Sequence, residues 1–308
     1  MNYNDRDFVA MALPSVHDVY YRHNYNALIK LYHEMMIILA GLHKVHIHGD
    51  PASLAALKSC GTIPAGVKFD LSFPHSPWIR DYMPIYGRNG WVKPIYKPSY
   101  QPQTLSAKID LWANKWLTEN KVGYKPLQLV IDGGNIIISP DQTVAILTEK
   151  VFHDNPDYLR DNVASMISEA FGINRFIVLP CENRDITGHV DSMCRWISND
   201  TLLINRYPSS FRSRLMSCLQ AKLPSDTKIV EIPYCPSSSE FAGFPSASGA
   251  YLNFLKTSKC CIIPTFCDVQ RDRKAFQLIS EYCDVPCLQV NSEAISKYGG
   301  VLNCISWN

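Results

Sequence analysis

The sequence predicts an α/β protein, folded as one domain over residues 1–308. Apolar patterns with the helical period alternate with short apolar runs of strand type along the whole chain. A chain of 308 residues with 46% hydrophobic content is long enough to bury a large core. No linker rich in Gly and Ser divides it, and the proline-studded stretch 233–248 is short enough to be an ordered surface loop.

The helices are predicted from apolar positions that recur every three or four residues. Within 24–42, one helical face carries Leu28, Leu31, Met35, Ile38, Leu39 and Leu42. A shorter helix at 51–57 starts on Pro51, a residue that the first helical turn accepts. The predicted helices are 24–42, 51–57, 105–120, 158–171, 211–223 and 274–282.

The strands are predicted from short runs of apolar and β-branched residues between these helices. They are expected at 45–47, 67–71, 91–96, 127–131, 144–147, 176–179, 202–205, 228–232, 260–264 and 287–290. A loop at 74–80 separates the second strand from the third. Helices recur every 50 to 60 residues or so, a spacing that suggests repeated supersecondary units.

Charge and hydropathy exclude several classes of partner. The net charge is +2, with 30 basic against 28 acidic residues, so no overall charge attracts nucleic acid or anionic lipid. The first fifteen residues lack both the basic and the apolar region of a secretory signal. The longest apolar stretch, 35–42, is too short to span a bilayer. We therefore expect a cytoplasmic protein with no nucleic-acid or membrane partner.

The cysteines indicate free thiols. There are 11, an odd number, and no C-x-x-C pair, so neither a zinc ribbon nor a disulfide framework is predicted. Cys194, Cys260, Cys261 and Cys283 lie among apolar neighbours and are interpreted as small buried hydrophobes. Free thiols of this kind fit a reducing cytoplasm.

One pair of histidines raises the question of a metal. His46 and His48 alternate on one face of a predicted strand, close to Asp50, and such histidines can bind a divalent ion. Solvent-exposed polarity of the strand is the preferred interpretation. We expect no metal and no organic cofactor.

Four short sequences stand out, because each joins a reactive or charged side chain to glycines or aromatic packing. They are W-I-R-D at 78–81, D-G-G-N at 132–135, G-H-V-D at 188–191 and G-G-V-L-N-C at 299–304. No Walker A, G-x-G-x-x-G or G-x-S-x-G signature competes with them. His189 and Asp191 stand two apart in a predicted extended segment, so both side chains would face one substrate. Gly133 and Gly134 would allow a ligand or backbone to approach closely.

Singly, these sequences are ordinary: D-G-G is usually a turn, and a buried histidine or cysteine usually fills a core. Together, in this order, they resemble the family of the Porphyromonas-type peptidyl-arginine deiminases and agmatine deiminases, over nearly the whole chain. The segment 188–196, GHVDSMCRW, is similar to the family's G-H-x-D followed by an arginine and an aromatic residue. The segments 249–268 and 298–306 resemble its later motifs.

The resemblance implies a fold and a set of roles. The fold is the pentein α/β propeller, with five pseudo-symmetric ββαβ units around a central active site. The implied nucleophile is Cys304, and the implied general acid and base is His189, oriented by Asp132. Asp81 and Asp191 would hold the substrate, because carboxylates bind the N–H groups of a guanidinium in pairs. Trp78, Gly134 and Asn303 complete the predicted substrate-binding residues.

The implied reaction converts a guanidino group to a ureido group and ammonia through a covalent intermediate on Cys304. The chain departs from the family pattern at Asn303, where the family commonly has histidine, and at Val301, where the family has a longer glycine run. It also lacks the N-x-W-G-G stretch of agmatine deiminases at 91–103, which disfavours agmatine itself.

The substrate is therefore left between two classes. A small guanidino compound, agmatine-like or derived from arginine, is ranked slightly above an arginyl peptide or protein. Lys93, Lys97 or Arg88 could meet the carboxylate of an arginine, although a solvated strand face is the preferred interpretation of the lysines.

Other functions stay open as well. An amidinotransferase would share Cys304, His189 and the carboxylates but pass the amidino group to an amine. A pentein that acts only as a binding or assembly module is the other alternative. The oligomeric state is undetermined, a homo-oligomer included.

Overall fold

Four three-stranded sheets of the computed structural model, which describes residues 3, 6–183 and 185–308, share one strand order. In each sheet the first strand runs antiparallel to the second, and the second runs parallel to the third. The strands are β4 (Ile85–Gly87), β5 (Gly90–Ile95), β6 (Lys125–Val130), β7 (Ile136–Ile138), β8 (Val144–Thr148), β9 (Arg175–Leu179), β10 (Cys194–Trp196), β11 (Thr201–Asn205), β12 (Lys228–Ile232), β15 (Leu255–Lys256), β16 (Cys261–Thr265) and β17 (Cys287–Asn291).

A further sheet joins the two ends of the chain. It has the order β18-β1-β2-β3, formed by β18 (Ser306–Trp307), β1 (Phe8–Ala12), β2 (Lys44–His48) and β3 (Lys68–Asp70). β18 is antiparallel to β1, and β1 is parallel to β2, so the pattern of the other four sheets recurs here. Because β18 pairs with a fully buried strand, the segment just before it is held firmly inside the protein.

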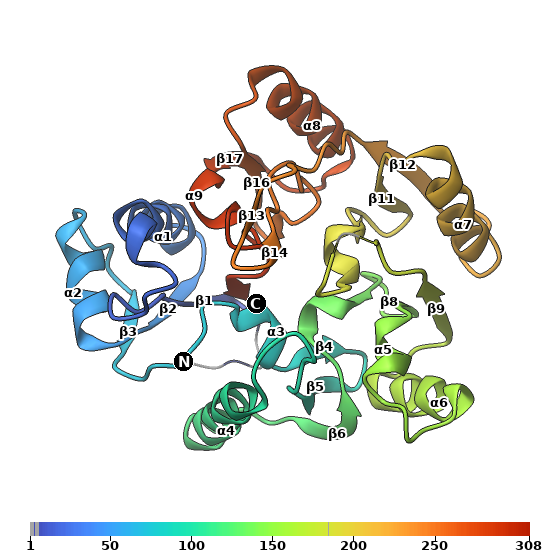
Figure 1. Cartoon of the computed structure of the whole chain (residues 1–308), viewed down its shortest axis with the longest axis horizontal. Helices are drawn as coiled ribbons and strands as arrows, with labels where there is room; N and C mark the ends of the chain where they lie inside the picture. Colours follow the sequence, from blue (N-terminus) through green and yellow to red (C-terminus); the bar gives the residue numbers. More distant parts are fainter. Residues whose placement is uncertain (1–2, 4–5, 184) are drawn as a thin grey trace.

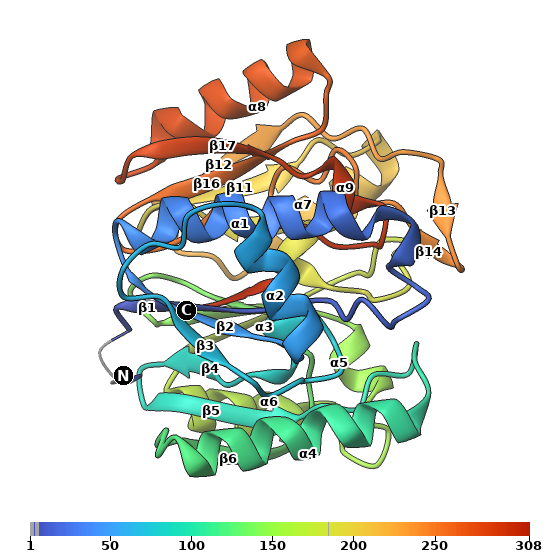
Figure 2. The same cartoon turned by 90° about the vertical axis from the view of Figure 1, so that its left-hand side faces the viewer.

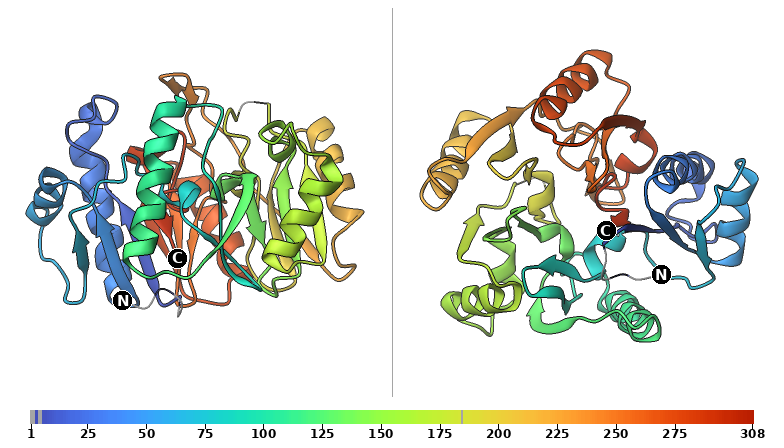
Figure 3. Two further views of the ribbon diagram at one scale, coloured as in Figure 1. Left: turned by 90° about the horizontal axis from the view of Figure 1, so that it is seen from below. Right: turned by 180° about the vertical axis from the view of Figure 1, so that it is seen from behind.

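Long helices connect the parallel strands of each sheet: α1 (Tyr25–Ala40), α4 (Gln103–Glu119), α6 (Arg160–Phe171), α7 (Ser209–Gln220) and α8 (Val269–Tyr282). Figure 1 shows these helices around the outside and the strands directed toward the middle, where the C-terminus lies. Figure 2 shows α1, α4 and α8 side-on, and Figure 3 shows the same ring from below and from behind.

The shorter elements lie mostly in the connections. They are η2 (Arg22–Asn24), α2 (Pro51–Ser59), α3 (Ile79–Tyr82), η3 (Gly133–Asn135), α5 (Lys150–His153), η4 (Val190–Ser192), β13 (Glu240–Phe241), β14 (Phe244–Pro245) and α9 (Glu293–Ser296). None of the helices in the described part of the chain has both the length and the apolar character needed to cross a membrane.

The predicted helices and strands are all present, with ends that differ by a few residues. For example, the helix expected at 24–42 is α1, whose inward face buries Leu28, Met35 and Leu39 completely. The sequence analysis missed β1, β18 and the first strand of each three-stranded sheet. Those first strands have only two or three residues, too few for a period of two to be recognised.

Two interpretations of polar side chains were wrong. His46 and His48 are not solvent-exposed but fully buried, and their neighbour is Asp70 on the adjacent strand β3. Lys93 does not lie on a solvated face: its side chain is 4% exposed, and its ammonium pairs with Asp110 at 2.5 Å. Both errors arose because the carboxylate that pairs with each buried side chain, Asp70 or Asp110, is distant from it in the sequence.

Candidate active site

The four unusual sequences all form tight turns, and these turns meet. Asp81 lies in the single turn of α3, Asp132 directly precedes η3, His189 directly precedes η4, and Cys304 lies in the turn before β18. The Arg80 backbone N–H donates to the Cys304 carbonyl at 3.2 Å, which joins α3 to the end of the chain. Short turns can bring polar side chains from distant segments to one point inside the protein, which a long helix with an exposed polar face does not do.

His189 is held between two carboxylates. Its Nε2 lies 3.0 Å from Oδ2 of Asp132, and its Nδ1 lies 3.7 Å from Oδ1 of Asp81. The same Asp132 oxygen also accepts a hydrogen bond of 3.1 Å from the hydroxyl of Tyr100. Both ring nitrogens therefore face acceptors, an arrangement that suits a protonated imidazole.

The two glycines of D-G-G-N allow this close packing. A Cβ on Gly133 would lie 2.0 Å from the Arg80 carbonyl oxygen, and one on Gly134 would lie 2.4 Å from Nδ1 of His189. The sequence analysis predicted that these glycines allow another group to approach closely. The groups that do so are the Arg80 backbone and the His189 imidazole. Gly134 also donates its N–H to Oδ1 of Asp81 at 3.0 Å.

Cys304 lies against Asp191. Its Sγ is 3.9 Å from Oδ2 of Asp191, and the Asn303 amide donates to the same oxygen at 2.7 Å. The other oxygen, Oδ1 of Asp191, is buried and has no hydrogen-bond partner among the described residues. The backbone N–H of Cys304 donates to Oδ1 of Asn253 at 3.3 Å, which orients the turn. Asp191 therefore has a free acceptor close to the sulfur atom.

Burial and neighbouring charges shift the protonation of the site. Burial lowers the pKa of His189, but the carboxylates of Asp81 and Asp132 outweigh it and raise the pKa to about 10. Burial raises the pKa of Asp81 to about 7, with Asp132 and Asp191 adding to the rise and His189 opposing it. Burial also raises the pKa of the Cys304 thiol well above its ordinary value, reinforced by Asp191 and Asp81. At neutral pH the empty site thus holds an imidazolium and a neutral thiol.

A cavity of about 100 Å³ opens at this cluster. Trp78, Asp81, His189, Asp191 and Cys304 line it. Gly300 permits the position of Trp78, because a Cβ there would lie 2.6 Å from the indole ring. The outer wall includes Phe244 and Pro245 of β14. Of the other residues predicted for the site, Asp132, Gly134 and Asn303 do not line the cavity: each contacts a residue that does.

Three contributors were missed in the sequence. Tyr100 bonds to a residue of the site but lies in no recognised motif, so no local signal identified it. Asn253 lies in the segment 249–268, which resembles a family motif, but it was given no role. Arg195 belongs to a recognised segment but was given no role. It lines a second cavity, of about 480 Å³, together with Arg6, Arg80, Lys256 and Asp191. Arg88, Lys93 and Lys97, considered for a substrate carboxylate, line neither of these two cavities.

Comparison with known families gives one match over nearly the full length. The model of the Porphyromonas-type peptidyl-arginine deiminase family matches residues 2–308. A protein of Shewanella frigidimarina (strain NCIMB 400), named "Putative agmatine deiminase", is 23% identical over 229 residues. That match covers 65% of this chain and 61% of the relative, so it spans less than two thirds of the relative's length.

Solved structures with the same fold include the agmatine deiminase of C. jejuni. Its TM-score is 0.83 at 17% identity, covering 98% of this chain and 93% of the other. A cysteine-to-serine variant of the C. jejuni enzyme with substrate bound has a TM-score of 0.79, also at 17% identity, with the same coverage of both chains. This likeness shows a common mixed α/β fold.

Proposed function

The chain belongs to the Porphyromonas-type peptidyl-arginine deiminase family, and we propose that it hydrolyses the guanidino group of a small cationic molecule with Cys304 as the nucleophile. The observation that carries this proposal is the pairing of a cysteine with a partly unsatisfied carboxylate, beside an imidazolium in the same cavity. A guanidinium needs all three groups. It must be held by carboxylates, attacked at carbon, and given a proton as ammonia leaves.

In the first half of the reaction, Asp81 and Asp191 accept hydrogen bonds from the planar guanidinium. Binding of this cation lets the Cys304 thiol release its proton to solvent. The resulting thiolate attacks the central carbon and forms a C–S bond, which gives a neutral tetrahedral adduct. The imidazolium of His189 gives its proton to one nitrogen, the C–N bond breaks, and ammonia departs. A positively charged S-alkylthiouronium remains attached to the sulfur, and His189 is left neutral.

In the second half, neutral His189 removes a proton from water, and the oxygen adds to the same carbon. Collapse of this adduct breaks the C–S bond and returns the Cys304 thiolate. The ureido product leaves after losing one proton. Asp132, which bonds to His189, and Tyr100, whose hydroxyl donates to the same oxygen of Asp132, are positioning residues here.

The substrate is proposed to be agmatine-like, with a second positive charge at its far end. Apart from His189, the charged side chains among the described lining residues are carboxylates: Asp81, Glu182, Asp185 and Asp191. Such a lining attracts a substrate with two cationic ends and repels the carboxylate of free arginine. The names of the Shewanella and C. jejuni relatives also favour this choice. An arginyl peptide is the alternative.

A direct assay tests this proposal. Purified protein is incubated with agmatine, arginine or an arginyl peptide, and both ammonia and the ureido product are measured. We expect kcat/KM for agmatine to exceed the value for arginine by at least about tenfold, an electrostatic preference of about 1.4 kcal/mol. Adding a primary amine should leave ammonia release unchanged. Transfer of the amidino group to that amine, in place of ammonia release, would instead identify an amidinotransferase.

The pH dependence of kcat/KM follows from the two raised pKa values. Because Asp81 must be ionised to bind a guanidinium, kcat/KM should fall more steeply as the pH decreases below about 7, where the pKa of Asp81 lies. The variant Asp132→Asn removes a charge that raises the pKa of His189, so any alkaline limb due to His189 should move to lower pH. An acid limb near the ordinary carboxyl pKa, about 4, would contradict this assignment.

The remaining proposals concern the molecule as a whole. The five recurring sheets support an arrangement as pseudo-symmetric ββαβ units of a pentein propeller, all within one domain. A cytoplasmic location and a homo-oligomeric state stay predictions.

A further inference from the structure

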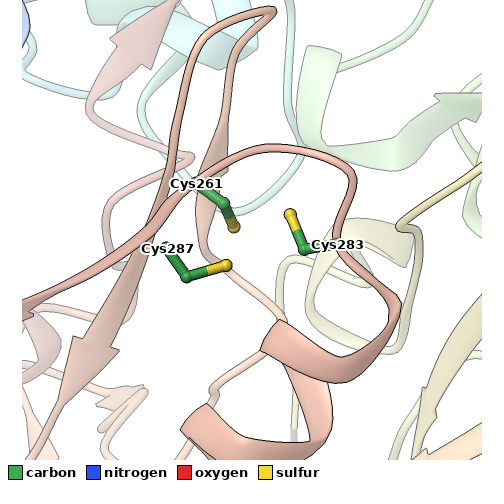
Figure 4. A group of neighbouring side chains, drawn as sticks. All are labelled: Cys261, Cys283 and Cys287. Atoms are coloured by element: carbon green, nitrogen blue, oxygen red, sulfur yellow. The ribbon is translucent and has the colours of Figure 1, made fainter.

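Three cysteines converge at a place that the proposed reaction does not use. Cys261, Cys283 and Cys287 have sulfur atoms that all lie within 4.8 Å of one another. Figure 4 shows the three side chains directed toward a common point, from two strands and from the end of a helix. Cys261 is buried, whereas Cys283 and Cys287 are partly accessible. None of the three lines the substrate cavity.

Regular structure places each of these thiols. Cys261 begins β16 and Cys287 begins β17, and the two residues are direct partners in the parallel pairing. Cys283 follows immediately after α8, the helix that connects these two strands. The Cys261 N–H also donates to the Pro286 carbonyl at 2.9 Å, which holds the segment before Cys287 in place. The convergence therefore follows from the fold of one strand-helix-strand unit.

The spacing suits a metal ion bound by thiolates. In a tetrahedral zinc site with bonds of about 2.3 Å, ligand sulfurs are about 3.8 Å apart. The three sulfurs here lie within 4.8 Å of one another, so their separations are compatible with that spacing. A disulfide would use only two of the three sulfurs. Partial exposure of Cys283 and Cys287 lets an ion enter and leaves space for a fourth ligand. One candidate is the hydroxyl of Ser280, whose oxygen is buried and interacts with Cys287.

Binding of the ion by three thiolates requires each of the three thiols to lose its proton, so affinity for the ion should rise with pH.

We propose that Cys261, Cys283 and Cys287 bind one zinc ion as three thiolate ligands, with the fourth position taken by water or by Ser280. Zinc would connect the C-terminal end of α8 to both strands that the helix links. Asn253, which accepts a hydrogen bond from Cys304, lies shortly before β15 of the same sheet. Because zinc would hold α8 and both strands together, its expected effect is greater stability of this part of the protein. The chemistry at Cys304 needs no zinc.

Cobalt(II) tests the site, because thiolate ligands give Co²⁺ an intense charge-transfer absorption in the near ultraviolet. Reduced, metal-free full-length protein is titrated with Co²⁺ and then with Zn²⁺. We expect saturation at one equivalent of Co²⁺, a spectrum typical of tetrahedral sulfur ligation, and loss of the signal as Zn²⁺ displaces it. In Cys287→Ser, and in Cys283→Ser, binding should weaken by at least about tenfold. The matched control Cys60→Ser, at an exposed thiol, should bind as the unmodified protein does.

Thermal unfolding gives a second measurement. Zn²⁺ should raise the Tm of the unmodified protein and of Cys60→Ser, because an ion that binds only the folded state stabilises it. It should not raise the Tm of Cys283→Ser. Absence of the thiolate absorption at one equivalent, or its persistence in both cluster variants, would overturn the proposal. Loss of the absorption in Cys304→Ala would do the same, since it would place the metal at the substrate cavity. Formation of a disulfide within the trio in place of metal binding would identify a redox pair and also overturn it.

Discussion

Replacing Cys304 with alanine should reduce ammonia release by about 10⁴-fold or more, which is the largest effect expected of any single substitution. The thiolate supplies the only proposed covalent step, and the neighbouring carboxylate of Asp191, whose Oδ2 lies 3.9 Å from the sulfur, is proposed to hold the substrate instead. The measurement is kcat with saturating agmatine, or with whichever guanidino substrate proves best.

This substitution should leave the fold intact. The Cys304 side chain packs in a turn held by backbone contacts to Asn253 and Arg80, and alanine preserves both. Circular dichroism and Tm should therefore match those of the unmodified protein within a few degrees. The matched control is Cys60→Ala, at an exposed thiol, which should keep full activity. Substantial turnover by folded Cys304→Ala would exclude the covalent mechanism while leaving the family assignment untouched.

The second large effect concerns how the nucleophile is activated. In the empty site, burial and the nearby carboxylates of Asp191 and Asp81 hold the pKa of Cys304 well above its ordinary value. A bound cation between those carboxylates would reverse the effect and favour the thiolate. A haloacetamidine carries such a cation, whereas iodoacetamide does not. We expect the haloacetamidine to modify Cys304 at least about 100-fold faster at neutral pH, since it is both bound and activating.

Rates are followed by mass spectrometry of the peptide that contains Cys304, between pH 6 and pH 9. Cys60 in the same digest is a control, because an exposed thiol should distinguish the two reagents only by their intrinsic reactivity. In Asp191→Asn the advantage of the haloacetamidine should fall sharply, as the variant loses one anionic contact. Rapid modification by iodoacetamide at pH 6, unchanged in Asp132→Asn, would show a thiolate already present without substrate and contradict this account.

Secondary structure was predictable wherever an element was long enough to show a period. α1 and α4 each expose one polar face and bury another, and β8 and β11 are fully buried, mostly apolar runs. The sequence analysis did not identify β18, because two residues define no pattern. It pairs with β1 only because the chain returns to its own beginning.

The candidate site was predictable to the extent that its residues lie in compact motifs. Asp81, Asp132, His189, Asp191 and Cys304 were named from local sequence and from the family that the motifs resemble. The contacts of Tyr100 and Asn253 were not: Tyr100 lies in no recognised motif, and Asn253 lies in a recognised segment whose resemblance gave it no role.

The sequence by itself determined the class of fold and the main helices and strands, and its family resemblance named the residues proposed to attack and hold a guanidinium. Tertiary structure decided which charges meet. His48 was expected near Asp50, but Asp50 caps α2 by accepting from the Ser53 N–H at 2.8 Å. The parallel register of β2 and β3 instead places His48 opposite Asp70. The same kind of register brings Cys261 to Cys287. Pairing across strands depends on the order and register of segments far apart in the chain, and local periodicity carries no information about either.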